Sequence, residues 1–191
     1  GQSFDTFDTD WYDGQRAPGK TKSAREHMEW VYDTCVEYAH NFGKRPANLL
    51  LFGAPGLGKT HLTLAVAGAV IEKGYIPIYG AAENLFSQIE KEKFTDGNRG
   101  AYDAMIKSDL LVIDDLGAEM ATPFSKSALY NLVNTRLLAN RPTVINTNLT
   151  MKEIEARYTP RISSRLIGSF ASHKFIGADI RQQKAVEKMG K

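Results

Sequence analysis

The segment Gly53–Thr60 reads GAPGLGKT and constrains the fold more than any other feature, because it matches the pattern G-x-x-x-x-G-K-[ST] in full. Its glycines allow the backbone to curl so that successive N–H groups point at phosphate oxygens. The segment follows a short apolar run at 48–52 and precedes a helical pattern at 59–73. These flanks predict a phosphate-binding loop (P-loop) between a buried strand and the positive end of a helix.

Two side chains of this loop carry the chemistry. We expect Lys59 to reach the β- and γ-phosphates of a nucleotide, and the Thr60 hydroxyl to complete the coordination shell of a Mg²⁺ ion. The other loop residues expected to contact the nucleotide are Gly53, Pro55, Gly56, Leu57 and Gly58.

A pair of acids ends a second apolar run at 109–114. A carboxylate at Asp114 can hold Mg²⁺ through water, opposite Thr60. Asp115 is the expected base or water-orienting group, and Glu119 is a possible substitute, although we expect Glu119 to be an exposed loop acid. No segment matches the Asn/Thr-Lys-x-Asp signature that reads guanine in GTPases, which favours ATP.

Strands alternate with helices along the chain, which predicts an α/β fold with a parallel five-stranded sheet and helices on both faces. Pro77 favours an edge position for its strand, since proline cannot donate to a sheet ladder. The expected strands are 48–52, 75–79, 109–114, 142–146 and 173–176. The expected helices are 23–42, 59–73, 82–93, 99–107, 123–139, a short helix from the Thr150–Glu153 capping box, 161–167, and the segment after Asp179.

The length of 191 residues suffices for one α/β domain, expected at 23–191. Residues 1–22 are polar and punctuated by Gly and Pro, and we expect them to form an extended arm or linker. The lone Cys35 cannot form an internal disulfide and is expected to be a buried apolar side chain. The aromatic residues that we expect to pin the arm to the core are Phe4, Phe7, Trp11 and Tyr12.

The net charge of +2 means that any nucleic-acid contact must come from a local patch or from several copies. The N-terminus lacks the pattern of a signal peptide, and the most apolar run, 62–71, is about half the length that spans a bilayer. We therefore expect a cytoplasmic protein without a membrane partner. The sequence does not begin with Met, so we expect an upstream domain to be missing from it.

The later segments resemble the AAA+ ATPases when they are combined with the two nucleotide motifs. These segments are Asn146-Thr-Asn148 after a strand, Arg161-Ile-Ser-Ser-Arg165-Leu after a short helix, and Arg181 near the end. The match is closest to bacterial replicative helicase loaders of the DnaC/DnaI type and to their relative, the IstB transposition helper ATPase. The phrases GAPGLGKTHL and DLLVIDDLG look like that subfamily, and the resemblance covers roughly residues 45–185.

The resemblance implies roles for five further residues. Asn148 would be the sensor-1 residue that orients the attacking water, and Arg181 resembles sensor 2, which contacts phosphate in cis. Arg165 matches the arginine finger that reaches the nucleotide of a neighbouring subunit, and Arg161, one helical turn earlier, is a second candidate. His61, directly after the loop, is expected at the nucleotide site.

The resemblance also implies cofactors and partners. They are ATP or ADP with Mg²⁺, an ATP-dependent oligomer, single-stranded DNA, and a replicative DNA helicase bound through the missing N-terminal domain. Hydrolysis would be slow and completed by a neighbouring subunit, in an AAA+ core without a C-terminal lid domain. The candidate DNA patch combines cations with an aromatic ring, although a solvated helix end is an equal alternative; its residues are Lys91, Lys93, Phe94 and Arg99.

The leading hypothesis is therefore the ATPase domain of a helicase loader, with an IstB-like transposition helper as its nearest alternative. A small-molecule kinase is a different class, in which Arg161 and Arg165 would act in cis as lid arginines. A nucleotide-gated binding module with negligible hydrolysis is a third class. It stays open because related ATPases often carry the longer Glu where this chain has Asp115.

Overall fold

A computed structural model describes residues 1–45, 47–95 and 100–189. Its centre is a sheet of five strands in the order β2-β3-β4-β1-β5, and every pairing in it is parallel. The expected α/β architecture is thus confirmed. The strands are β1 (Leu49–Phe52), β2 (Pro77–Ala81), β3 (Leu110–Leu116), β4 (Thr143–Thr147) and β5 (Ala171–Lys174).

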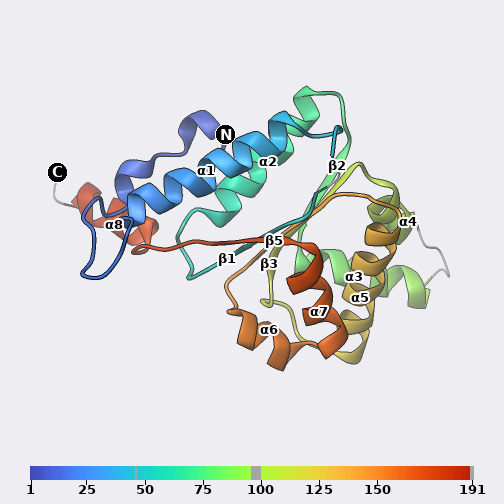
Figure 1. The fold of residues 1–191 in the computed structure, drawn as a ribbon. Coiled ribbons are helices and arrows are strands. Elements are labelled where there is room, and N and C mark those ends of the chain that lie inside the picture. The colour runs from blue at the N-terminus through green and yellow to red at the C-terminus, as the bar shows by residue number, and fades with distance from the viewer. Residues whose placement is uncertain (46, 96–99, 190–191) are drawn as a thin grey trace.

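Helices cover both faces of the sheet (Figure 1). Alternate residues of a strand point to opposite faces, so β1 sends Leu49 and Leu51 into one apolar cluster and Leu50 into the other. The first cluster is closed by α1 (Ala24–His40) and α2 (Lys59–Glu72). Around the second lie α3 (Ala82–Thr95), α4 (Gly100–Lys107), α5 (Pro123–Leu138), α6 (Met151–Arg157) and α7 (Pro160–Ser169).

The edge strands differ from their predicted bounds. Pro77 does lie in an edge strand, β2, but this strand starts at Pro77 rather than at Tyr75, and Ile76 before it is 71% exposed. The strand expected at 173–176 lies at 171–174, where Ala171 pairs with Leu49. Both shifts arise because pairing with a central strand sets the register, and an apolar pattern alone does not contain that information.

Residues 1–22 lie against the P-loop side of the domain. They contain two short 3₁₀ helices, η1 (Phe4–Thr6) and η2 (Thr9–Trp11). Tyr12 is buried, and its hydroxyl donates to the backbone oxygen of Leu57 over 2.7 Å, while the Phe7 ring stacks on Tyr32 with centroids 5.7 Å apart. The aromatic residues of the arm therefore contact the core and the P-loop.

The start of α1 and its buried cysteine agree with the sequence patterns. Ser23 caps α1 in a capping box with Glu26, and Cys35 is fully buried in the cluster beneath α1. Burial raises the pKa of the Cys35 thiol to about 12. No helix in the described ranges is both long enough and apolar enough to cross a membrane.

Candidate functional site

The P-loop connects β1 to α2 and has a backbone that requires glycine. Gly56 and Gly58 adopt positive φ angles of 76° and 86°. A Cβ atom would lie 2.0 Å from Oδ1 of Asp179 at Gly56 and 2.7 Å from the Phe7 ring at Gly58. Residues larger than glycine are thus excluded from these two positions by conformation and by space. The N–H groups of the loop lie next to those at the N-terminus of α2.

Lys59, the first residue of α2, folds back over this loop. Its Nζ donates to the backbone oxygens of Gly53 and Ala54, at 2.7 Å each, and the side chain is buried. Burial lowers the pKa of Lys59 to about 8; the Asp115 and Asp114 carboxylates oppose this shift, whereas the Arg181 charge adds to it. The lysine is therefore a desolvated cation aimed into the loop where phosphates would bind.

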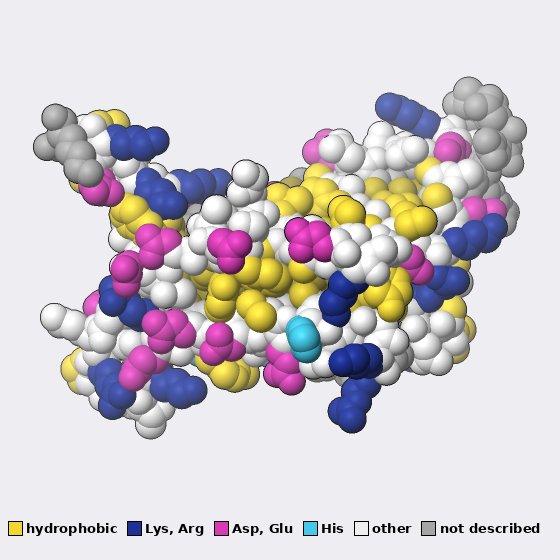
Figure 2. Space-filling model, turned by 90° about the horizontal axis from the view of Figure 1, so that it is seen from above, with side chains coloured by type: hydrophobic (Ala, Val, Ile, Leu, Met, Phe, Trp, Pro, Cys, Tyr) yellow, Lys and Arg dark blue, Asp and Glu magenta, His cyan; other side chains and the backbone are white. Residues whose placement is uncertain are grey.

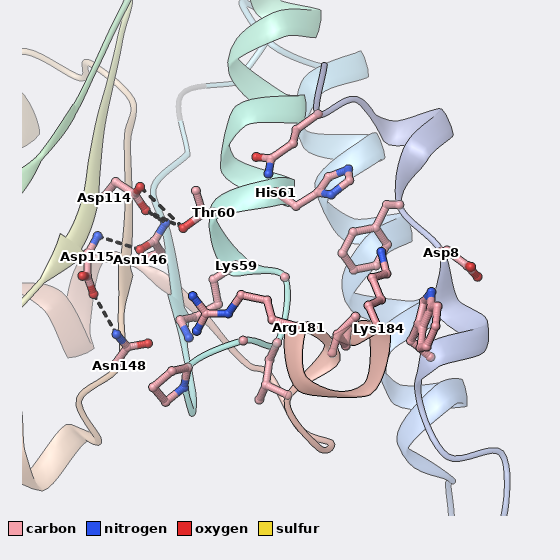
Figure 3. A pocket seen from close by; sticks show the side chains of 18 of the residues that line it. Asp8, Lys59, Thr60, His61, Asp114, Asp115, Asn146, Asn148, Arg181 and Lys184 are labelled. Carbon is pink, nitrogen blue, oxygen red and sulfur yellow. Dashed lines mark hydrogen bonds between the residues drawn. The ribbon is translucent and has the colours of Figure 1, made fainter. Parts of the chain in front are cut away.

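Asp114 lies at the centre of a polar cluster beside Thr60 (Figure 3). Thr60 Oγ1 donates to Oδ1 of Asp114 over 3.1 Å. The same Oδ1 accepts from the Asn146 amide, and Oδ2 accepts from the Tyr79 hydroxyl. A carboxylate and a hydroxyl that converge beside a phosphate loop are ligands that suit Mg²⁺, directly or through water, so these residues fit the expected ion.

Asp115 has a strained backbone conformation near the C-terminal end of β3. Its φ is 53°, and the pairing of β3 with β4 shifts register between Ile113 and Leu116. A positive φ is uncommon for a residue other than glycine, and such a bulge re-aims side chains. The Asp115 N–H donates to Oδ1 of Asn146 over 2.8 Å, and its Oδ1 accepts from Nδ2 of Asn148 over 2.7 Å.

Two residues of this cluster were not predicted as site residues. Asn146 is 1% exposed and joins Asp114, Asp115 and Thr63 through its amide group. A polar residue inside the apolar pattern of β4 was a usable signal for it. Tyr79 offered no signal, because its contact with Asp114 depends on the β2–β3 register. Burial, followed by the hydrogen bond and charge of Asp114, raises the pKa of the Tyr79 phenol.

A cavity of about 420 Å³ is lined by polar residues of the P-loop, β3 and β4, by the arm and by the last helix, α8 (Ile180–Met189). The polar residues are Lys59, Thr60, Asp114, Asp115, Asn146 and Asn148. The arm contributes Phe7 and Trp11, and α8 contributes Arg181 and Lys184 (Figure 3). Nζ of Lys184 lies 5.3 Å from the centroid of the Trp11 ring. The cavity therefore has a polar end at the sheet and an aromatic end at the arm.

His61 also lines the cavity, on the side of the arm. Its Nε2 lies 2.8 Å from the Ser3 oxygen and 3.2 Å from Oγ1 of Thr6, and the Phe7 ring meets the imidazole edge-on. The contacts of His61 thus link α2 to the arm.

Four residues predicted for the nucleotide site do not line the cavity: Gly53, Glu119, Arg161 and Arg165. Arg161 and Arg165 are exposed on α7. Glu119 is not the exposed loop acid expected from the sequence: it is 3% exposed, and its carboxylate accepts from the Gly117 N–H and the Tyr158 hydroxyl. Those bonds occupy the Glu119 carboxylate, whereas Asp114 and Asp115 both line the cavity beside the P-loop.

The candidate DNA patch contains an aromatic residue beyond those predicted. The Phe94 ring is 73% exposed and lies 6.3 Å from the ring of Phe124, at the start of α5. Nζ of Lys93 lies 5.8 Å from the first ring and 5.4 Å from the second. Lys91 is exposed on α3, the helix that also carries Lys93 and Phe94. Arg99 falls outside the described residues.

The chain matches a protein family and several known proteins. A family model described as IstB-like ATP binding protein matches residues 37–177. The replicative helicase loader DnaC of Buchnera aphidicola is 29% identical over 134 residues, which are 68% of this chain and 54% of that protein. The chain spans about half the length of the curated relatives it matches.

Solved structures show the same fold. A crystal structure of the DnaC helicase loader superposes with a TM-score of 0.75 at 20% identity and covers 91% of this chain and 96% of that chain. The replication initiator DnaA, bound to AMPPCP and single-stranded DNA, has a TM-score of 0.72 at 20% identity, with coverage of 86% and 51%. At this low identity the similarities show the fold alone, which is the parallel α/β architecture described above.

Proposed function

The chain belongs to the family of IstB-like ATP-binding proteins, and on this premise we propose that it is the ATP-hydrolysing domain of a replicative helicase loader. The observation that carries the proposal is the convergence of the P-loop with Asp114 and with the Asp115–Asn148 pair at one edge of the sheet. The similarity to DnaC supports a loader in particular. Both Asp114 and Asp115 lie in β3, so the sheet fixes their position.

ATP would bind with its phosphates in the P-loop and its base toward the arm. The loop N–H groups and Lys59 would hold the phosphate oxygens, while Phe7 and Trp11 offer aromatic surface for the base. Thr60 and Asp114 would hold Mg²⁺, which when bound withdraws negative charge from the phosphates. These residues bind and orient the substrate before any bond changes.

Asp115 is the group that would act on the attacking water. Its carboxylate would accept the hydrogen bond of a water molecule and orient the water oxygen toward the terminal phosphorus. Asn148 holds Oδ1 of Asp115 and thereby the direction of that carboxylate. Attack forms one P–O bond, the bond to the β–γ bridging oxygen breaks, and the products are ADP and phosphate.

A neighbouring copy would complete the site. Arg165 and Arg161 lie exposed on α7, away from the cavity of their own chain. A guanidinium presented in this way is available to a nucleotide held by another subunit, where it would stabilise charge in the transition state. This arrangement supports the loader over the small-molecule kinase, which needs the same arginines in cis.

Single-stranded DNA would bind at Lys91, Lys93 and Phe94, with Phe124 as a second ring. Figure 2 shows the molecule from above, with Lys and Arg side chains lying among Asp and Glu side chains around a hydrophobic middle. On a face with charges mixed in this way, attraction and repulsion of a polyanion largely offset each other.

ATPase activity measured against protein concentration tests the proposal. We expect the rate per subunit to rise with concentration and with single-stranded DNA, and to fall about 100-fold or more in Arg165→Ala. Lys152→Ala, an exposed cation on α6, is the matched control and should keep the wild-type rate. A rate per subunit that is independent of concentration and unchanged in Arg165→Ala would exclude the shared site.

The partner separates the loader from its nearest alternative. The family model that matches residues 37–177 is described as IstB-like ATP binding protein, which favours an IstB-like transposition helper as the second candidate. Capture of a replicative helicase by the full-length protein supports the loader, whereas capture of a transposase supports the helper. The loader hypothesis and the helper hypothesis assign the same chemistry to the P-loop.

A further inference from the structure

Tyr79 lies in the edge strand β2 and contacts Asp114, on the side of the site where Thr60 also lies. It pairs with Val112, and Asp114 lies two residues further along β3. Residues two apart on a strand share a face of the sheet, and Val112 packs in the cluster beneath α2. Tyr79 therefore lies on the face that carries Thr60, and its hydroxyl donates to Oδ2 of Asp114.

The two oxygens of Asp114 have different partners. Oδ1 accepts from Thr60 at 3.1 Å and from the Asn146 amide, whereas Oδ2 accepts from Tyr79, with Thr60 more distant at 3.5 Å. A bond to each oxygen fixes the rotation of a carboxylate about its own axis. The Tyr79 hydroxyl thus keeps Oδ1 turned toward the Thr60 hydroxyl.

Packing does not account for the tyrosine. Its side chain is 36% exposed and belongs to neither of the apolar clusters. A hydroxyl hydrogen bond to a charged carboxylate is strong and directional, and phenylalanine would provide the same ring without it. The feature that distinguishes this side chain from phenylalanine is therefore its hydroxyl group, which bonds to Asp114.

We propose that Tyr79 is a positioning residue for the divalent-cation site, acting through Asp114. The inference rests on the proposed function, since it assumes that Thr60 and Asp114 hold Mg²⁺ with a nucleotide. Loss of the hydroxyl would free Asp114 to rotate, and the site would bind Mg²⁺ less tightly while the P-loop stayed intact. Groups that orient metal ligands typically contribute a factor of about 10 to 100 in metal affinity.

The test is a binding measurement that needs no turnover. A fluorescent, non-hydrolysable ATP analogue is titrated onto wild type, Tyr79→Phe and Tyr130→Phe, first in EDTA and then over a range of MgCl₂ concentrations. Tyr130, a partly buried residue of α5 outside the cavity, is the matched control for removing a phenol oxygen. Thermal unfolding of each variant accompanies the titrations.

We expect Tyr79→Phe to raise the MgCl₂ concentration for half-maximal tightening about tenfold, with affinity in EDTA and the control unchanged. An unchanged MgCl₂ dependence in Tyr79→Phe overturns the inference alone. Equal weakening with and without MgCl₂ also overturns it, because the hydroxyl would then support the loop or the fold. If wild type binds the analogue without any effect of MgCl₂, the proposed Mg²⁺ site fails, and this inference fails with it.

Discussion

Nδ2 of Asn148 donates a 2.7 Å hydrogen bond to Oδ1 of Asp115 and so ties the end of β4 to the end of β3. Asp115 needs such a tie, because its φ of 53° lies in a region that few residues other than glycine adopt. The bond fixes the carboxylate at the place where the sheet register shifts. If Asp115 orients the attacking water, as proposed, Asn148 would act on catalysis through the direction of the Asp115 carboxylate.

Asn148→Ala should therefore slow turnover without weakening nucleotide binding. We expect kcat to fall about 10- to 100-fold, since a free Asp115 carboxylate orients water poorly. Steady-state ATPase assays and equilibrium ATP binding measure the two quantities separately. Asn131→Ala, an exposed asparagine on α5, is the control. A variant with normal kcat and weaker ATP binding would assign Asn148 to the nucleotide instead of to Asp115.

Phe94→Ala should weaken binding of single-stranded DNA. The ring is 73% exposed and can stack with a base, a contact that contributes about 1–3 kcal/mol. Fluorescence anisotropy with a labelled oligonucleotide, in ATP and at fixed salt, measures the loss. Ile71→Ala removes another exposed apolar side chain and should have no effect. Equal affinities for all three proteins would show that DNA binds elsewhere.

Arg136 is a fully buried cation whose described hydrogen-bond partners are all neutral oxygens. Its guanidinium donates to the backbone oxygens of Met105, Ser108 and Pro142, among others, and so joins the end of α4 to the start of β4. Burial lowers the pKa of Arg136 to about 10, which leaves it charged at neutral pH.

Arg136→Met should lower the free energy of unfolding by about 3–5 kcal/mol, because the carbonyl groups would stay buried without donors. Urea unfolding measures this loss. Arg141→Met is the control: Arg141 also donates to the Ser108 oxygen but is only partly buried, so its loss should be about 1 kcal/mol or less. Equal losses in the two variants would contradict this account of Arg136.

His173 should make the fold sensitive to acid. The ring is 8% exposed, and neither nitrogen has a hydrogen-bond partner among the described residues. Burial, with a smaller contribution from His27, lowers the pKa of His173 below its ordinary 6.5. As the pH falls, the unfolded chain therefore binds a proton at this histidine at a higher pH than the folded chain does. Protonation of His173 has no effect on stability well above pH 6.5 and increasingly destabilises the fold below it.

Urea unfolding of wild type and His173→Phe at pH 7.5 and pH 5.5 tests this sign. We expect the phenylalanine variant to lose less stability on acidification than wild type, by about 1 kcal/mol. His40→Gln, which removes an exposed histidine, should follow wild type. An identical loss in all three proteins would show that His173 does not titrate with folding.

Much of the fold could be predicted because its signals are local. The Thr150–Glu153 capping box, the apolar central strands and the glycines of the P-loop each follow from neighbouring residues. The register of edge strands β2 and β5 could not be predicted, since it depends on which strand lies beside them.

The site divides in the same way. Lys59, Thr60 and Asp114 belong to sequence motifs whose residue types and spacing predict a phosphate and Mg²⁺ site. Tyr79 comes close to Asp114 through the pairing of β2 with β3. Glu119 is buried beside Tyr158, which lies 39 residues later in the sequence and donates a hydrogen bond to it. Contacts between residues distant in sequence leave no mark in a local pattern.

If the loop from Gly53 to Thr60 binds the phosphates of ATP, the affinity for ATP must depend on Lys59. Equilibrium ATP binding to wild type and Lys59→Ala measures this dependence. Lys59 is buried against the loop, so its removal deletes the charge that phosphate needs. Lys73→Ala, an exposed lysine just after the same helix, is the control. We expect an affinity about 100-fold weaker in Lys59→Ala alone. An affinity equal to that of wild type would show that this loop does not hold the phosphates of ATP.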